Sequence, residues 1–263
     1  MKNQMLKKFV NAKQREIDYL KLQDEQGTLP GPSDGKRPVL PVLPVLIDAL
    51  SSPDPCIIAE YKRASPSQGV INSEVSAAEA ARIFAASGAA ACSVLTEEDY
   101  FQGDISYLED FASQGIPVLR KDFLFHPLQI RQTAGTRSSA LLLIVRVVQN
   151  LELLKSLVDL TFEYAMEPVV EIFNHQELDM ARKSGARVIL VNNRDLDRLN
   201  VDMDVSRKLI KHKDSQEIWI CASGIESREQ VKEFHDLGFE AFLIGTSIMS
   251  SVDPEAMLRG LIK

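Results

Sequence analysis

Short apolar runs alternate with longer segments whose apolar residues recur every three or four positions, from residue 57 to the end of the chain. The runs resemble buried parallel strands, and the segments between them have the period of helices that bury one face. Eight runs are predicted as strands: 57–62, 91–95, 117–121, 140–145, 168–172, 188–192, 218–222 and 241–245. Their starts recur every ~20 to 34 residues, the length of one strand-plus-helix unit, which predicts an α/β fold, a closed (β/α)8 TIM barrel. The alternative is a doubly wound open sheet, but no Gly-x-Gly-x-x-Gly motif follows the first strand.

An amphipathic helix precedes the barrel pattern, with Leu6, Phe9, Ile17 and Leu20 at helical spacing among charged residues. A Gly/Pro-rich stretch follows, and residues 38–46 repeat Pro-Val-Leu three times, which predicts an extended connector. We therefore divide the chain at residue 50. Residues 1–50 are expected to form an N-terminal helix and a Pro-rich connector packing on the barrel, and residues 51–263 the catalytic barrel.

Composition narrows the function classes. The 263 residues carry a net charge of −7 with a pI near 5.3, which argues against nonspecific nucleic-acid binding. Three separated cysteines in apolar runs fit buried thiols, and the four histidines lack metal-ligand spacing, so no metal is expected. No secretion signal or membrane span is recognisable, so we expect no membrane association and a cytoplasmic location.

Polar side chains end the apolar runs at several predicted strands. Glu60 and Lys62 are two residues apart, which places both on one face of a strand. Lys121, Glu171 and Asn192 end later strands, and Arg194 follows the last of these. A parallel barrel gathers such residues at its C-terminal mouth, which predicts a polar site there. A solvated loop lysine or a structural Glu60–Lys62 ion pair is the alternative interpretation.

Small residues follow the last two predicted strands, namely Ser223 and Gly224 after one, and Gly245 and Thr246 after the other. Loops in these positions hold phosphate in many barrels, because small residues let backbone N–H groups approach an anion. The alternative is that the glycines only permit tight turns.

Motifs at all eight predicted strands agree in order and spacing with one family. Residues 57–67 read IIAEYKRASPS, 119–123 read LRKDF, 191–196 read VNNRDL, and 242–246 read FLIGT. In these motifs the chain resembles the indole-3-glycerol phosphate synthases, decarboxylating lyases of tryptophan biosynthesis. The resemblance covers about residues 57–263, and the leading helix resembles the family's N-terminal extension.

The resemblance implies a carboxy-lyase that closes the pyrrole ring of 1-(2-carboxyphenylamino)-1-deoxyribulose 5-phosphate without any cofactor. It implies Lys121 as general acid and Glu171 as general base. Lys62 would contact the substrate carboxylate or phosphate and share the role of general acid, with Glu60 and Asn192 orienting Lys62 and the developing hydroxyl. The substrate-binding residues implied are Arg194 for the polar end, Phe101, Phe123 and Leu142 for the aromatic ring, and Ser65, Ser223, Gly224, Gly245 and Thr246 for the phosphate. Other enzymes of tryptophan biosynthesis are its candidate partners.

One residue departs from the family pattern within the site. The family usually has Glu-Ser-Gly-Ile at the seventh strand, whereas this chain has Ala222 before Ser223. The alternative hypothesis is therefore a weakened paralogue that binds a phosphorylated ligand or a partner enzyme without efficient turnover. A third hypothesis is an isomerase or aldolase on the same phosphate-binding barrel, which leaves the aromatic residues and the VNNR motif unexplained.

Overall fold

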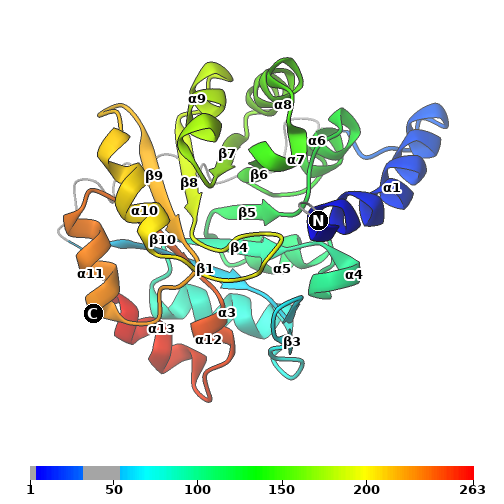
Figure 1. Ribbon diagram of the computed structural model, residues 1–263. Helices are drawn as coiled ribbons and strands as arrows, with labels where there is room; N and C mark the ends of the chain where they lie inside the picture. Colours follow the sequence, from blue (N-terminus) through cyan, green and yellow to red (C-terminus); the bar gives the residue numbers. More distant parts are fainter. Residues whose placement is uncertain (1–3, 32–53) are drawn as a thin grey trace.

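The computed structural model describes residues 4–31 and 54–263, and within them eight parallel strands close into a barrel (Figure 1). Going round, the order is β1-β10-β9-β8-β7-β6-β5-β4, so each strand pairs with its neighbours in sequence and the last pairs with the first. The barrel strands are β1 (Cys56–Tyr61), β4 (Ala91–Leu95), β5 (Val118–Lys121), β6 (Ala140–Ile144), β7 (Glu167–Ile172), β8 (Val188–Asn192), β9 (Ile218–Ala222) and β10 (Ala241–Ile244). The predicted TIM barrel is confirmed, with every strand within one residue of its predicted bounds.

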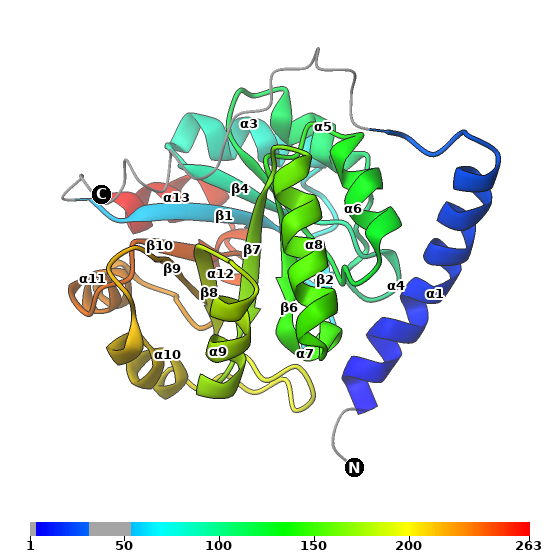
Figure 2. The same cartoon turned by 90° about the horizontal axis from the view of Figure 1, so that it is seen from above.

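Helices surround the barrel and cover its outer face (Figures 1 and 2). They are α3 (Ala77–Ser87), α4 (Glu98–Phe101), α5 (Tyr107–Ala112), α6 (Pro127–Ala134), α7 (Val145–Val148), α8 (Leu151–Glu163), α9 (His175–Lys183), α10 (Asp204–Leu209), η1 (Ile210–His212), α11 (Arg228–Asp236), α12 (Thr246–Met249) and α13 (Pro254–Ile262). Local sequence sets several helix starts: Ser227 and Gln230 form a capping box, and Asp253 caps α13 ahead of Pro254. A small hairpin of β2 (Ala64–Ser65) and β3 (Gly69–Val70) follows β1 and was not anticipated.

Strand alternation divides the apolar residues into two cores. One set points outward and packs under the helices, whereas Ile58, Leu119, Val169 and Ile220 belong to a second cluster inside the barrel. Because a strand returns to the same face every two residues, the positions two residues later also point inward, at the C-terminal end. Those positions are Glu60, Lys121, Glu171 and Ala222. The site therefore follows from the register of four alternate strands.

The N-terminal helix α1 (Gln4–Glu25) lies beside the mouth of the barrel and against α6 (Figures 1 and 2). Its Phe9 side chain is 1% exposed and stacks on Phe123, with ring centroids 4.5 Å apart, while Tyr100 meets Phe9 edge-on. The amphipathic helix predicted from the sequence is thus confirmed, and its apolar face rests on the loops after β4 and β5. The Pro-Val-Leu connector lies outside the described residues.

A buried ionic network lies beneath α1. Lys13 donates a hydrogen bond of 2.8 Å to Asp122 and pairs with Glu16, and the Arg120 guanidinium lies 3.2 Å from the same Asp122 carboxylate. Thr96 donates a further bond of 2.6 Å to Asp122. Burial alone would raise the pKa of Asp122, but Lys13 and Arg120 outweigh it and hold that pKa below its ordinary value. The carboxylate is therefore ionised and fully partnered.

We expect Lys13→Met to lower the free energy of unfolding by about 3 kcal/mol, because it leaves Asp122 and Glu16 with less compensating charge in a buried site. Arg120 still pairs with Asp122, which keeps the loss at the lower end of the usual range. Urea unfolding followed by circular dichroism measures the change. Lys21→Met, which removes an exposed lysine from the same helix, is the control and should alter stability by less than about 0.5 kcal/mol. Equal stability of the two variants would contradict the expectation.

Candidate active site

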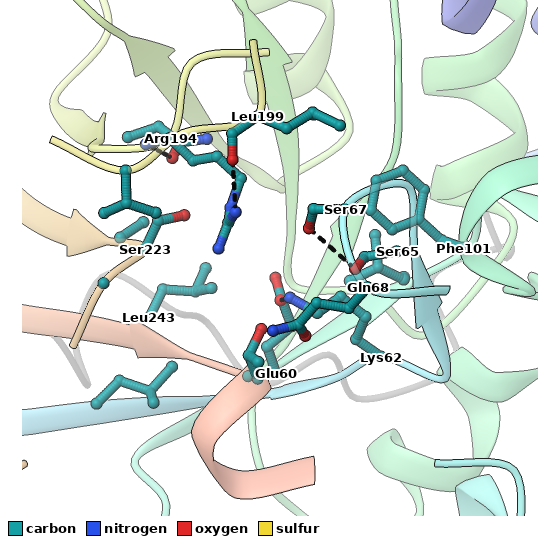
Figure 3. A pocket seen from close by; sticks show the side chains of 18 of the residues that line it. Glu60, Lys62, Ser65, Ser67, Gln68, Phe101, Arg194, Leu199, Ser223 and Leu243 are labelled. Carbon is teal, nitrogen blue, oxygen red and sulfur yellow. Dashed lines mark hydrogen bonds and ion pairs between the residues drawn. The ribbon is translucent and has the colours of Figure 1, made fainter. Parts of the chain in front are cut away.

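A cavity of about 290 Å³ opens at the C-terminal mouth of the barrel. Eleven of the residues selected from the sequence line it: Glu60, Lys62, Ser65, Phe101, Lys121, Asn192, Arg194, Ser223, Gly224, Gly245 and Thr246. Figure 3 shows Glu60 and Lys62 on one side of the cavity and Arg194 reaching toward them from another. Most of the residues selected from the sequence therefore line one cavity.

Two lysines and two carboxylates form a charged centre here, in which Glu60, Lys62 and Lys121 line the cavity and Glu171 lies behind Lys121. Lys62 lies 2.9 Å from Glu60, and the Lys121 ammonium lies 3.9 Å from Glu60 and 3.7 Å from Glu171. Lys121 thus sits between the two carboxylates, at distances that leave it without a tight hydrogen bond to either. Its ammonium is free to turn toward a bound molecule.

The two carboxylates have opposite pKa shifts. Burial would raise the pKa of Glu60, but Lys62 and Lys121 outweigh burial and hold that pKa below its ordinary value. For Glu171 burial dominates and raises the pKa, although Lys121 and the Asn192 amide oppose it. One Glu171 oxygen accepts a 3.1 Å bond from Asn192, while the other is buried without a hydrogen-bond partner. A desolvated carboxylate with an unused oxygen suits proton abstraction.

The segment after β8 forms one wall. The Asn192 amide donates to Glu171 and its oxygen accepts from the Arg194 backbone N–H at 2.9 Å, so one side chain fixes both neighbours. The Arg194 guanidinium donates to the Leu199 carbonyl at 2.8 Å and extends into the cavity (Figure 3). Arg194 therefore has one hydrogen bond to hold it and further donors to offer.

Small residues after β9 and β10 also line the cavity, beside the segment after β8. Ser223 and Gly224 both have positive φ, of 68° and 86°, and a Cβ on Gly224 would lie 2.5 Å from the Met203 sulfur. A Cβ on Gly245 would lie 2.5 Å from a Glu60 carboxylate oxygen. Glycine at 245 is thus needed for the close approach of Glu60, and not only for a tight turn.

The aromatic candidates separate into two groups. Phe101 lines the cavity, whereas Phe123 and Leu142 do not, and they are 5% and 1% exposed. Phe123 stacks under Phe9, which itself lines the cavity. Leu142 packs in the barrel interior. Glu171 does not line the cavity either, but its carboxylate lies 3.7 Å from the ammonium of Lys121, which does.

Sequence reasoning missed several lining residues. Phe9, Ser67, Gln68, Leu196, Leu199 and Val201 all line the cavity. For Phe9 a signal existed, because the amphipathic helix required a surface on which to dock. The other residues lie in loops, where no periodicity marks which side chains face a cavity.

Ala222 lies at the floor of the cavity, 2% exposed, with Asn192 and Leu243 opposite it on the neighbouring strands. A longer side chain at this position would point toward Lys121 and Glu60, because all three belong to the inward-facing set of alternate strands. The structure thus locates the departure from the family pattern within the charged centre.

Among residues 4–31 and 54–263, no cluster of three or more His, Cys, Asp or Glu side chains is placed to hold a metal ion. The three cysteines there are free and buried, as expected. The helices of the same two segments include none with the length and apolarity needed to cross a bilayer.

The fold and the cavity define a (β/α)8-barrel protein with a cluster of lysines and carboxylates at its C-terminal mouth. The family model for indole-3-glycerol phosphate synthase matches residues 6–261. Curated proteins of that name include one from Aquifex aeolicus, 41% identical over 81% of this chain and 84% of its own length, and one from Carboxydothermus hydrogenoformans, 40% identical over 78% of each. The chain belongs to the indole-3-glycerol phosphate synthase family.

Solved structures support the fold independently. The 3-hexulose-6-phosphate synthase of Salmonella typhimurium superposes with a TM-score of 0.61 at 15% identity, over 78% of this chain and 96% of that one. KGPDC from Streptococcus mutans gives 0.60 at 13% identity, over 79% and 95%. At such identities the likeness concerns the barrel alone.

Proposed function

We propose that this protein is an indole-3-glycerol phosphate synthase, a carboxy-lyase acting on 1-(2-carboxyphenylamino)-1-deoxyribulose 5-phosphate. The observation that carries the proposal is the position of Lys121, 3.9 Å from Glu60 and 3.7 Å from Glu171. A proton donor beside a desolvated carboxylate is what a condensation followed by a dehydration needs. Membership of the family supplies the substrate.

The first step closes the ring. The aromatic carbon that bears the carboxylate attacks the ribulose carbonyl, Lys121 donates a proton to the carbonyl oxygen, and loss of carbon dioxide restores the aromatic ring. Lys62 contacts the substrate and shares acid duty, while Glu60, 2.9 Å away, orients it. Protonating the oxygen as the bond forms avoids a free alkoxide in a partly desolvated cavity.

The second step removes water. Glu171 takes a proton from the CH2 group bonded to the nitrogen, the new hydroxyl takes a proton from a lysine ammonium and leaves as water, and the double bond of the pyrrole forms between the two carbons. The raised pKa of Glu171, caused first by burial, brings its basicity closer to the range useful near neutral pH. Asn192 holds Glu171 in place through the 3.1 Å hydrogen bond and orients the developing hydroxyl.

Binding positions the reacting atoms. Ser65, Ser223, Gly224, Gly245 and Thr246 are assigned to the phosphate, and Arg194 to the polar end of the substrate. Phe101 is assigned to the aromatic ring, with Phe123 and Leu142 behind the lining. A folded substrate pressed against this surface brings the ring carbon to the carbonyl, which is a large part of the rate gain available to such an enzyme.

The direct test is turnover of the carboxyphenylamino substrate by the purified chain, followed by the fluorescence of the indole product. Product formation well above the rate without protein is expected. A chain that folds, as judged by circular dichroism, and gives no product would overturn the proposal.

Ala222 favours a second candidate, a weakened paralogue that binds phosphorylated ligand or a partner enzyme without efficient turnover. Ala222→Glu discriminates the two. The added carboxylate would face Lys121 and Glu60, and we expect kcat to stay unchanged or to rise, by up to about 100-fold if the site is a weakened one. Ala222→Gln is the matched control, because it adds the same volume without charge. A drop of more than about tenfold for glutamate alone would show that the site is built around alanine.

No cofactor enters the proposed reaction. A small phosphorylated substrate is the proposed partner, and the cytoplasmic location and contacts with other enzymes of tryptophan biosynthesis stay predictions.

A further inference from the structure

The loop of residues 195–200, which follows β8, contains a strained residue and depends on contacts with other segments to keep its conformation. Leu196, Leu199 and Val201 line the cavity, and Leu199 has φ of +61°, a conformation that a leucine adopts at a cost of about 1 kcal/mol or more. The Leu199 carbonyl accepts the bond from Arg194, so the strained residue holds the guanidinium in the cavity. If this loop relaxes, the position of Arg194 changes with it.

Asp195 organises the loop from within. Its Oδ1 atom accepts hydrogen bonds from the backbone N–H groups of Asp197 and Arg198, at 2.9 and 2.8 Å. Its own backbone N–H donates to the Asn200 carbonyl, and its carbonyl accepts from Leu199. The conformation of residues 195–200 thus depends on where this one carboxylate is held.

Arg146 holds that carboxylate. It lies in α7, directly after β6, and its Nη1 atom donates to Asp195 Oδ2 at 3.3 Å. Its Nε atom donates to Glu177 at 2.8 Å, and its guanidinium lies 3.9 Å from the centroid of the Phe173 ring. One planar cation therefore joins the segments after β6, β7 and β8, in a geometry that a lysine cannot reproduce.

Arg146 also acts on the charged centre. Four groups influence the Glu171 carboxylate: Lys121 from β5, Asn192 from β8, Glu60 from β1 and Arg146 from α7. Burial raises the pKa of Glu171, and the positive charge of Arg146 works against that rise. Loss of the cation would therefore raise the pKa of Glu171 further.

We infer that Arg146 is a positioning residue: by holding Asp195 against the rim, it keeps the loop of residues 195–200 and the Arg194 guanidinium in place for substrate. The inference rests on the proposed function for its kinetic consequence but not for its structural one. Arg146 is not among the residues that line the cavity, and no motif in the sequence singles it out.

Two replacements of Arg146 distinguish the effect of its hydrogen bonds on the loop from the effect of its charge on Glu171. In Arg146→Met we expect KM to rise about tenfold while kcat near neutral pH changes less than about threefold, because binding by Arg194 is weakened. The acid limb of kcat/KM should also move to higher pH. Arg146→Lys keeps the charge but loses the ring stacking and one of the two ion pairs. It should return the acid limb to its wild-type position while KM stays high.

Arg187 provides a matched control. It also lies over a phenylalanine, with its guanidinium 4.9 Å from the Phe162 ring centroid, and it pairs with Glu167 at 2.9 Å, but it precedes β8 at the opposite end of the barrel. Arg187→Met should leave KM, kcat and the acid limb unchanged.

Hydrogen exchange supplies a readout that needs no turnover. The amides of residues 197–199 should exchange at least about tenfold faster in Arg146→Met than in the wild-type chain or in Arg187→Met. Unchanged exchange, or faster exchange with unchanged KM, would overturn the inference. A wild-type chain without turnover would instead sink the proposed function, and the exchange rates would then decide the role of Arg146 alone.

Discussion

Lys121→Ala is expected to lower kcat by about 10²- to 10⁴-fold, the range that a positioned general acid contributes. Lys121 is the ammonium that lies within 4 Å of both Glu60 and Glu171. Its removal leaves the carbonyl oxygen of the substrate without its proposed proton donor, and the neighbouring Lys62 stays engaged with Glu60 at 2.9 Å. Single-turnover measurement of indole fluorescence separates this loss from slower product release.

The control for this change is another half-buried, ion-paired lysine. Lys213 has the same side-chain exposure as Lys121, 17%, and bonds to Glu240 and to the Gly238 carbonyl, just before the start of β10. Lys213→Ala should keep full turnover. If Lys121→Ala retained more than about a tenth of the wild-type rate, the general acid would have to be another group.

Glu171→Gln is expected to lower kcat by a similar factor, about 10²- to 10⁴-fold, because the amide is nearly isosteric but cannot accept a proton at this pH. The neutral amide also ends the pairing with Lys121. If the two steps are separable, the dehydration alone should slow, and the intermediate formed after loss of carbon dioxide should accumulate. Rapid-quench analysis of the products detects it.

The pH dependence follows from the direction of the Glu171 shift. A general base must be ionised, so kcat/KM rises as the pH increases through the pKa of Glu171 in the free enzyme. Burial raises that pKa above the ordinary value of about 4.3 for glutamate, which moves the acid limb toward neutral pH. In Glu171→Gln this limb should disappear from the residual activity. An unchanged acid limb would assign it to another group.

Glu167 is the matched control for Glu171. Both belong to β7 and both have a pKa raised by burial, but Glu167 begins the strand and pairs with Arg187 at the far end of the barrel. Glu167→Gln should therefore preserve turnover and the acid limb, with at most a modest loss of stability. Loss of activity in both variants would mean that strand β7 tolerates no change, and the assignment of Glu171 would fail.

The success of the sequence in predicting the strands has a simple cause. Parallel strands buried on both faces are nearly continuous apolar runs. The bounds of β4 and β8, for example, follow from where those runs begin and end in the sequence. The polar residues that end such runs lie at the same rim in any parallel barrel. Glu60, Lys121 and Asn192 could therefore be assigned to one site from the sequence alone.

Three features of the site were beyond this reasoning. The stacking of Phe9 on Phe123, which takes Phe123 out of the cavity lining, depends on how a separate helix docks. The contrast between Glu60 and Glu171 depends on which carboxylate has the closer lysine. The role of Arg146 depends on the meeting of segments that lie about 50 residues apart.

The sequence by itself determined the barrel, the end of the barrel that carries the site, and the residue types gathered there. Hydrophobic periodicity and the succession of strands and helices are properties of neighbouring residues, so they can be read along the chain. Only the tertiary structure decided which side chains reach the cavity, for which carboxylate burial outweighs the nearby positive charge, and which arginine supports the loop after β8. Those outcomes depend on distances of a few ångströms between residues remote in sequence, and electrostatic and packing energies change steeply over such distances.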